Sequence, residues 1–354
     1  MTFIMSFANV PSTLLMLGDL LISSDKGRTT ESRLPSRFAP QQGEVDHHIT
    51  GLMQKVFSVD GRLGVAWAGN AMVARHLILL VRDKIPGDYT GDNILRIIAG
   101  ADLPPYELES VSFIFYAIDD LDRIQVQDYL TKETCFSSTG KIKFSGSGEY
   151  HFLDMLGFDF NEIIGPRNGH HQKPMETWEE QVVGDLAGLL HHAALAFFQE
   201  VYTDEPHSFR YGGGFEVMSP NPGTKQMDKF PYTSLFWGYR SKSLQLLGPI
   251  VAYQYHSDGL LQIDRFSQEG TFWKCDSFLA GNFLVSANSR MPNEPASNNH
   301  IAVHYLVDLD DPSGPLKTVT TFGHRYVELM RSVTGYRFEV DDEIVDRILA
   351  LVSG

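Results

Sequence analysis

Apolar residues near the start of the chain fall into two short runs with a polar break between them. The runs are "TFIMSFA" (2–8) and "TLLMLGD" (13–19), and Asn9, Pro11 and Ser12 lie in the break. Short apolar runs bounded by turn-forming residues are typical of β-strands. We therefore predict that the fold begins with a β-hairpin, because the break leaves neither run long enough for a membrane-spanning helix of about 20 residues.

The next segment combines a second hairpin with two helices. In "KVFSVDGRLGVAWAG" (55–69), two apolar runs flank Asp60-Gly61, which is a strong short-range signal for a hairpin turn. Apolar residues then recur at helical spacing in "NAMVARHLILLVRDKIP" (70–86). A shorter helix is expected from about Gly91 to Ala99.

The middle of the chain returns to strands and then to a long helix. Three strand-like runs follow one another and suggest one antiparallel sheet: "SVSFIFYAID" (110–119), "RIQVQDYL" (123–130) and "KIKFSGSG" (141–148). A long helix is predicted to begin at Thr177, where T-W-E-E forms a capping box with Glu180.

The C-terminal part is mostly strand-like. Apolar and aromatic runs with Gly and Pro between them extend from Gly212 to about Leu306, and a last helix is predicted roughly from Asp342 to Val352. This order of elements fits helices layered against antiparallel sheets better than a wound βαβ fold. We therefore predict an α+β protein with an αββα sandwich.

Composition narrows the class of protein. The 354 residues are 43% hydrophobic and carry a formal charge of −15, which argues against a general nucleic-acid binder. The two cysteines, Cys135 and Cys275, provide no disulfide framework and no CxxC metal site. Glycine-rich phosphate loops are absent from the sequence, and no basic segment precedes the first apolar run. We expect a cytoplasmic globular protein with no cofactor and no membrane contact.

Three histidine pairs raise the question of a metal site: His47-His48, His170-His171 and His191-His192. Adjacent side chains on a helix or strand point in different directions, so neighbouring histidines rarely hold one ion together. We expect no metal site.

Three segments together resemble a known family: "TFIMSFANVPSTLLMLGD" (2–19), "QKVFSVDGRLGVAWAGNAMVARHLILLVRDKI" (54–85) and "KFSGSGEY" (143–150). They are similar to the proteasome β-subunit and its bacterial relative, the HslV-type peptidase. These proteins are N-terminal-nucleophile hydrolases with a four-layer αββα sandwich. The resemblance implies a hydrolase core over residues 2–218. Residues 219–354 would then be a strand-rich extension that continues the sheets or contacts a partner.

The resemblance assigns the central chemistry to three residues. Thr2 corresponds to the nucleophile, which becomes N-terminal once Met1 is removed. Its own α-amine would take the hydroxyl proton, since an α-amine has a pKa of about 7.7 to 8.0. Lys55 corresponds to the lysine that stabilises the developing alkoxide, and Asp19 to the carboxylate that keeps this lysine charged.

Two further positions complete the implied site. Gly69 of "AWAG" resembles the glycine whose backbone N–H forms the oxyanion hole. In the "SGSG" of 145–148, Ser147 is preferred over Ser145 as the residue that hydrogen-bonds near the free amine. A further family aspartate has no clean counterpart; Asp204 is the nearest.

A second register within the same hairpin stays open. "SSDKGR" (23–28) also resembles the family's Asp-x-Arg, which would make Asp25 the partner of the lysine. The nucleophile would then be Ser12 or Thr13, released by internal cleavage.

The resemblance implies a threonine peptidase acting on peptides or proteins, assembled as a homo-oligomer. A catalytically silent scaffold that binds a protein partner through residues 219–354 is the first alternative. An amidase for small molecules is the second, because the same nucleophile serves both kinds of amide.

Overall fold

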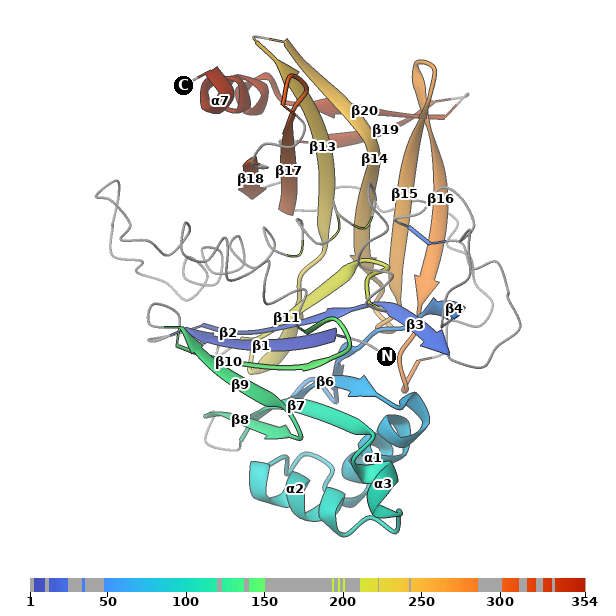
Figure 1. The fold of residues 1–354 in the computed structure, drawn as a ribbon, viewed down its shortest axis with the longest axis vertical. Coiled ribbons are helices and arrows are strands. Elements are labelled where there is room, and N and C mark those ends of the chain that lie inside the picture. The colour runs from blue at the N-terminus through green and yellow to red at the C-terminus, as the bar shows by residue number, and fades with distance from the viewer. Residues whose placement is uncertain are drawn as a thin grey trace.

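The computed structural model shows a strand-rich protein with helices at two ends (Figure 1). It describes residues 3–9, 13–24, 34–35, 48–119, 123–136, 140–149, 193, 197, 200, 211–221, 223–241, 243–285, 301–311, 317–322, 327–332 and 335–353.

The first sheet contains the start of the chain. Its six strands run in the order β12-β11-β2-β1-β10-β9. They are β1 (Phe3–Asn9), β2 (Thr13–Asp19), β9 (Lys132–Phe136), β10 (Gly140–Gly146), β11 (Phe215–Asn221) and β12 (Gln226–Lys229). The predicted first hairpin is confirmed, since β1 and β2 pair antiparallel from Ile4 opposite Gly18 to Asn9 opposite Thr13.

The second sheet has four strands in sequence order and carries helices on its outer face. The strands are β5 (Val56–Val59), β6 (Leu63–Gly69), β7 (Val111–Ile118) and β8 (Ile124–Tyr129). The helices are α1 (Ala71–Lys84), α2 (Gly91–Ala99) and the short α3 (Pro105–Leu108). The predicted turn and both predicted helices are confirmed. Asp60 and Gly61 both have positive φ, at 52° and 72°, as the tight turns of hairpins require.

The third sheet lies on the opposite side of the first sheet from the second one (Figure 1). Its eight strands run in the order β18-β17-β13-β14-β15-β16-β20-β19, and every neighbouring pair is antiparallel except β13 with β17. They are β13 (Tyr232–Arg240), β14 (Ser243–Tyr255), β15 (Leu261–Glu269), β16 (Phe272–Ala280), β17 (Ile301–Asp308), β18 (Lys317–Phe322), β19 (Val327–Ser332) and β20 (Gly335–Val340). A small separate sheet pairs β3 (Leu21–Ser24) with β4 (His48–Leu52).

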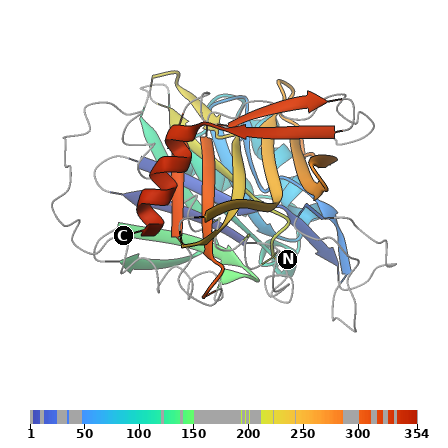
Figure 2. The same cartoon turned by 90° about the horizontal axis from the view of Figure 1, so that it is seen from above.

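The C-terminal helix α7 (Asp342–Ser353) covers part of the outer face of the third sheet (Figure 2). Ile344 and Ile348 of this helix are fully buried in a cluster with Leu235 and Trp237 of β13. The predicted last helix is therefore confirmed. Among the described helices, none combines the length and apolar character needed to cross a membrane.

Alternation along the strands explains the stacking of the sheets. In β1, Ile4 points into a cluster shared with Ala66 and Ile114 of the second sheet. Its neighbours Phe3 and Met5 point the other way, into a cluster with residues of the third sheet. The first sheet is therefore buried on both faces, and it forms the middle layer of the molecule (Figure 1).

The predicted αββα sandwich is wrong. The described helices cover the second sheet and, through α7, part of the outer face of the third sheet, whereas the far face of the first sheet packs largely against that third antiparallel sheet. Ala193 and Phe197 are the described helical residues in that cluster. The physical reason is that residues after 230 form a sheet with an apolar face of their own, and such a face must be buried against another one.

One smaller expectation is also wrong. The three consecutive strands do not form one sheet, because β7 and β8 pair in the second sheet while β10 pairs with β1 and β9 in the first. The expected boundary at residue 218 falls inside β11, and β12 continues the same sheet. The start of the long helix at Thr177 lies outside the described residues.

Candidate functional site

The candidate site begins where β1 starts. Asp19, the last residue of β2, is fully buried, and its Oδ1 accepts a hydrogen bond of 2.8 Å from the backbone N–H of Phe3. Phe3 also pairs with Gly146 of β10. The end of β2 and the end of β10 therefore meet at the first described residue of the chain.

Lys55 extends into the same place from the residue before β5. Its Nζ lies 2.9 Å from Asp19 Oδ1 and donates a second hydrogen bond of 2.6 Å to the backbone oxygen of Leu21. Both side chains of the ion pair are completely buried. The structure thus brings together two of the predicted residues, 36 positions apart in sequence.

Burial governs the electrostatics of this pair. Loss of water raises the pKa of Asp19 above its usual range, and the Lys55 ammonium and the N–H groups of Phe3 and Gly212 oppose this shift. Burial likewise lowers the pKa of Lys55, and the charge of Asp19 opposes that change. Each group therefore depends on the other to stay charged.

Gly69 and Ser147 line a shallow pocket of about 210 Å³. The other lining residues are small or hydroxylic, with one carboxylate at the pocket: Ala68, Glu109, Ser110, Ser112, Ser145 and Gly146. Because Gly146 pairs with Phe3, the pocket adjoins the start of β1. Both Ser145 and Ser147 line it, so the choice between these two serines stays open.

Gly69 ends β6 in a backbone conformation that no other residue type would fit at this position. Its φ is +100°, and a Cβ atom at this position would lie 2.1 Å from the backbone oxygen of Ser110. The glycine allows the chain to turn beside the pocket and enter α1, where Asn70 caps the first turn by accepting from the N–H groups of Met72 and Val73.

Several predicted residues lie outside the described part of the chain. They are Thr2, the proposed nucleophile, and the alternatives Ser12, Asp25 and Asp204. Thr13 is described, and it pairs with Asn9 at the turn end of the first hairpin. Asp19, one of the two proposed partners for Lys55, is in contact with it.

Sequence reasoning missed a run of three glycines that supports Asp19. Gly212, Gly213 and Gly214 all have positive φ, at 124°, 74° and 102°. The N–H of Gly212 donates to Asp19 Oδ2 at 3.0 Å, and its carbonyl accepts from the N–H of Leu21 at 2.9 Å. Three consecutive glycines in a sequence indicate an unusual backbone conformation, but they do not indicate that Asp19 is the residue they bind.

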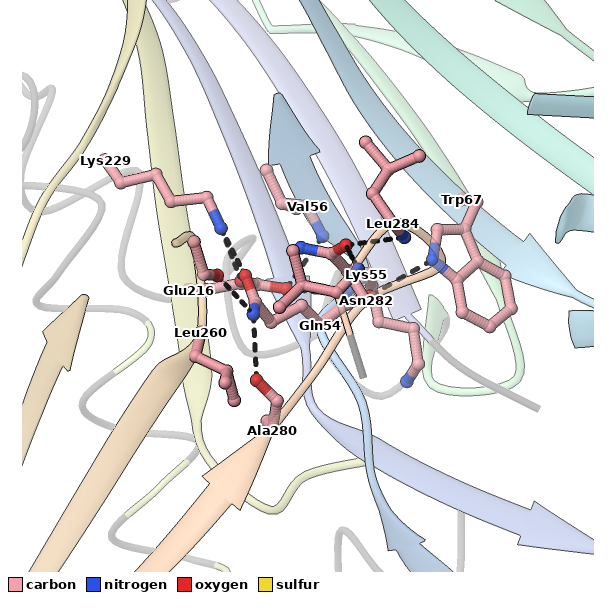
Figure 3. Close-up of polar contacts among 12 residues, drawn as sticks. Gln54, Lys55, Val56, Trp67, Glu216, Lys229, Leu260, Ala280, Asn282 and Leu284 are labelled. Atoms are coloured by element: carbon pink, nitrogen blue, oxygen red, sulfur yellow. Dashed lines mark hydrogen bonds and ion pairs between the residues drawn. The ribbon is translucent and has the colours of Figure 1, made fainter. Parts of the chain in front are cut away.

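Glu216 is a second missed residue. It is buried on β11, and its Oε1 accepts from the backbone N–H groups of both Lys55 and Val56, the latter at 2.7 Å. Lys229 of β12 lies 3.9 Å from Oε2 and also donates to the side chain of Gln54 (Figure 3). Burial raises the pKa of Glu216 to about 7 and lowers the pKa of Lys229 to about 8.

The described side chains do not place three or more His, Cys, Asp or Glu residues where they could hold a metal ion together. The arrangement instead offers a buried ammonium, a carboxylate partner and a small polar pocket at one end of β1. Comparisons of the chain with models of protein families and with curated protein sequences found no match.

Proposed function

We propose that the chain is an N-terminal threonine hydrolase that cleaves peptide bonds, with Thr2 as the nucleophile. The observation that carries the proposal is the buried Asp19–Lys55 pair, whose carboxylate holds the backbone N–H of Phe3, the residue directly after Thr2. This contact ties an ammonium group to the start of the chain, where the nucleophile is proposed to act.

Stability alone is a weak explanation for a buried ion pair. Its desolvation cost is comparable to the attraction between the charges, and apolar residues of similar size often replace such a pair without loss. Strongly perturbed ionisable groups beside a pocket are typical of functional sites. The Asp19–Lys55 pair is connected to the pocket of Gly69 and Ser147 through Phe3, which binds Asp19 and pairs with Gly146, a lining residue of the pocket.

The proposed reaction has two steps. In the first, Thr2 Oγ attacks the scissile carbonyl carbon, and the hydroxyl proton passes to the α-amine of Thr2. The C–N bond then breaks, the leaving amine takes that proton, and an ester forms on Thr2. In the second step the same α-amine takes a proton from water, which attacks the ester carbon. The bond from that carbon to Thr2 Oγ breaks, the proton passes to Thr2 Oγ, and the acid product leaves.

The other residues stabilise charge in this scheme. Lys55 favours the developing alkoxide of Thr2, and Asp19 keeps Lys55 protonated against the effect of burial. The backbone N–H of Gly69 receives the oxyanion, and Ser147 hydrogen-bonds near the free amine. The pocket of small and hydroxylic residues suits a compact side chain of the substrate.

Assembly and location belong to the same proposal. We infer a cytoplasmic homo-oligomer that acts on peptides or proteins, with residues 219–354 available for a protein partner. Non-peptide amides remain a second substrate class, because the proposed nucleophile does not discriminate between the two.

The intact mass and the N-terminal sequence of the purified protein test the first requirement. A chain beginning at Thr2 is expected, and it should turn over fluorogenic peptides. Thr2→Ala should abolish turnover while leaving the far-ultraviolet circular dichroism spectrum unchanged. Undiminished turnover in Thr2→Ala would overturn the proposal, because another group would then be the nucleophile. A chain that keeps Met1 would also overturn it and would favour a silent scaffold. A chain beginning at Ser12 or Thr13 would move the nucleophile there.

A further inference from the structure

The side chain of Glu216 contacts the main chain of the candidate site rather than one of its side chains. Its carboxylate is buried, and one oxygen accepts from two consecutive backbone N–H groups, those of Lys55 and Val56. Glu216 belongs to β11 of the first sheet, whereas Val56 opens β5 of the second. The carboxylate therefore joins two stacked sheets at the residue that carries the ammonium group.

The charge of Glu216 is balanced from the neighbouring strand. Lys229 of β12 places its Nζ 3.9 Å from Glu216 Oε2 and 4.5 Å from the centre of the Tyr255 ring. The same Nζ donates to Gln54 Oε1, so the cation lies between the two side chains (Figure 3). Lys229 is thus the counter-ion of Glu216 and a partner of Gln54.

Gln54 extends this network to the third sheet. Its Nε2 donates at 2.8 Å to the backbone oxygens of both Ala280 and Gly259, and its own N–H donates at 2.8 Å to the oxygen of Gly281. Gln54 is completely buried and directly precedes Lys55. The three residues 54–56 are therefore held by partners from the first and third sheets.

We propose that Glu216 is a positioning residue for the site: with Lys229 and Gln54 it fixes the main chain at Lys55, and so places the ammonium against Asp19. The inference rests on the proposed function for its catalytic meaning. It also implies that the third sheet helps to hold the site in place through its contacts with Gln54.

Alternative roles for Glu216 fit the contacts less well. As a general base it would need an open path to substrate, yet its Oε1 is bound to two main-chain N–H groups and its residue is 1% exposed. Within the described part of the chain, the charged and titratable groups that face it are Lys55, Lys229, Tyr232 and Tyr255. Its neighbours thus include two cations that can stabilise a carboxylate.

Two variants separate the hydrogen bonds of Glu216 from its charge. Glu216→Gln keeps an oxygen that can accept from the N–H groups of Lys55 and Val56, whereas Glu216→Ala removes the acceptor. Asp264→Ala is the matched control, because Asp264 is also a fully buried, hydrogen-bonded carboxylate, but on β15.

Hydrogen exchange measured by mass spectrometry tests the positioning directly, without any assay of activity. In Glu216→Ala, the peptide containing Lys55 and Val56 should exchange about tenfold faster or more, while peptides from β13 and β14 stay protected. Glu216→Gln should restore most of the protection. Unchanged exchange at Lys55 and Val56 in Glu216→Ala, or equal acceleration in Asp264→Ala, would overturn the inference.

Kinetics test the catalytic meaning of the same contact. Glu216→Ala should lower kcat by about tenfold or more with little change in KM, because misplacement affects the reacting groups more than binding. Glu216→Gln should recover kcat and alter its dependence on pH near 7, while Asp264→Ala keeps the original profile. Equal kcat and pH profiles in all variants would refute positioning. Absence of hydrolysis in the unaltered protein would refute the proposed function instead, and the exchange result would still decide whether Glu216 holds Lys55.

Discussion

At the scale of single residues, the most unusual feature is a lysine and an aspartate that are both completely buried. Asp19 receives hydrogen bonds from Lys55 and from the main chain of Phe3 and Gly212. These contacts offset the cost of removing a charged carboxylate from water. The pair is therefore interdependent, and its two members should not behave as independent contributors to stability.

Removing one member of the pair should be more harmful than removing both. We expect Lys55→Met to lower the free energy of unfolding by about 3 to 5 kcal/mol, because it leaves a buried charge without its partner. The double variant Asp19→Asn/Lys55→Met should be much more stable than the sum of the single effects predicts. Urea unfolding of the unaltered protein, of Lys55→Met, of Asp19→Asn and of the double variant measures this coupling. Additive effects would show that the two charges do not depend on each other.

At the scale of elements, the helices and hairpins formed by neighbouring residues were predictable. The hairpins β1–β2 and β5–β6 and the helices α1, α2 and α7 follow from patterns within about 20 residues, because turn residues and apolar spacing act over short distances. Asp19, Lys55, Gly69 and Ser147 were selected by resemblance, and the structure places two of them in contact and two at one pocket.

What was not predictable is which elements meet. β11 pairs with β2 although about 200 residues separate them, and no local pattern encodes that choice. The same limit explains why the αββα sandwich was wrong, since alternation marks an apolar face without naming what covers it. Glu216 was missed for this reason: a Glu inside a strand gives no signal that it will bind the main chain of another sheet.

The contact between β11 and β5 has a predictable dependence on pH. The pKa of Glu216 rises from its ordinary 4.5 to about 7 on folding, through burial. Its contribution to stability is therefore fully present below pH 4.5 and is lost as the pH rises through about 7. The free energy of unfolding should fall over this range by up to about 3 kcal/mol from this group alone.

Comparison with Glu216→Gln isolates this contribution, because glutamine does not titrate. The ammonium group of Lys229, with a pKa of about 8, titrates above this pH range. Urea unfolding at pH 5 and pH 7 should therefore show a larger loss of stability in the unaltered protein than in Glu216→Gln. Equal losses would mean that Glu216 stays ionised throughout.

At the scale of the whole molecule, the first sheet is a shared middle layer. One of its faces packs against the second sheet and the other against the third. Gln54 and the bridge between Met53 and Gly281 add polar contacts between the site region and the third sheet. The strands after residue 230 are therefore in direct contact with the part of the chain that carries the site.

Removing the third sheet should unfold the remainder. A chain ending at Lys229 would expose the apolar face formed by residues such as Phe3, Leu17 and Val217, which the third sheet now covers. We expect this shortened chain to bind hydrophobic dye and to show no cooperative thermal transition. A sharp transition in the shortened chain would show that the residues up to Lys229 fold without the third sheet.

The central claim is that Thr2 is a nucleophile activated beside Lys55. A peptide β-lactone tests it most directly, since a hydroxyl nucleophile opens the lactone ring and keeps the acyl group as an ester. Mass spectrometry of the digested protein should locate one added probe on Thr2, and Lys55→Ala should slow its formation. A probe attached elsewhere, or none attached to a chain that begins at Thr2, would contradict the account.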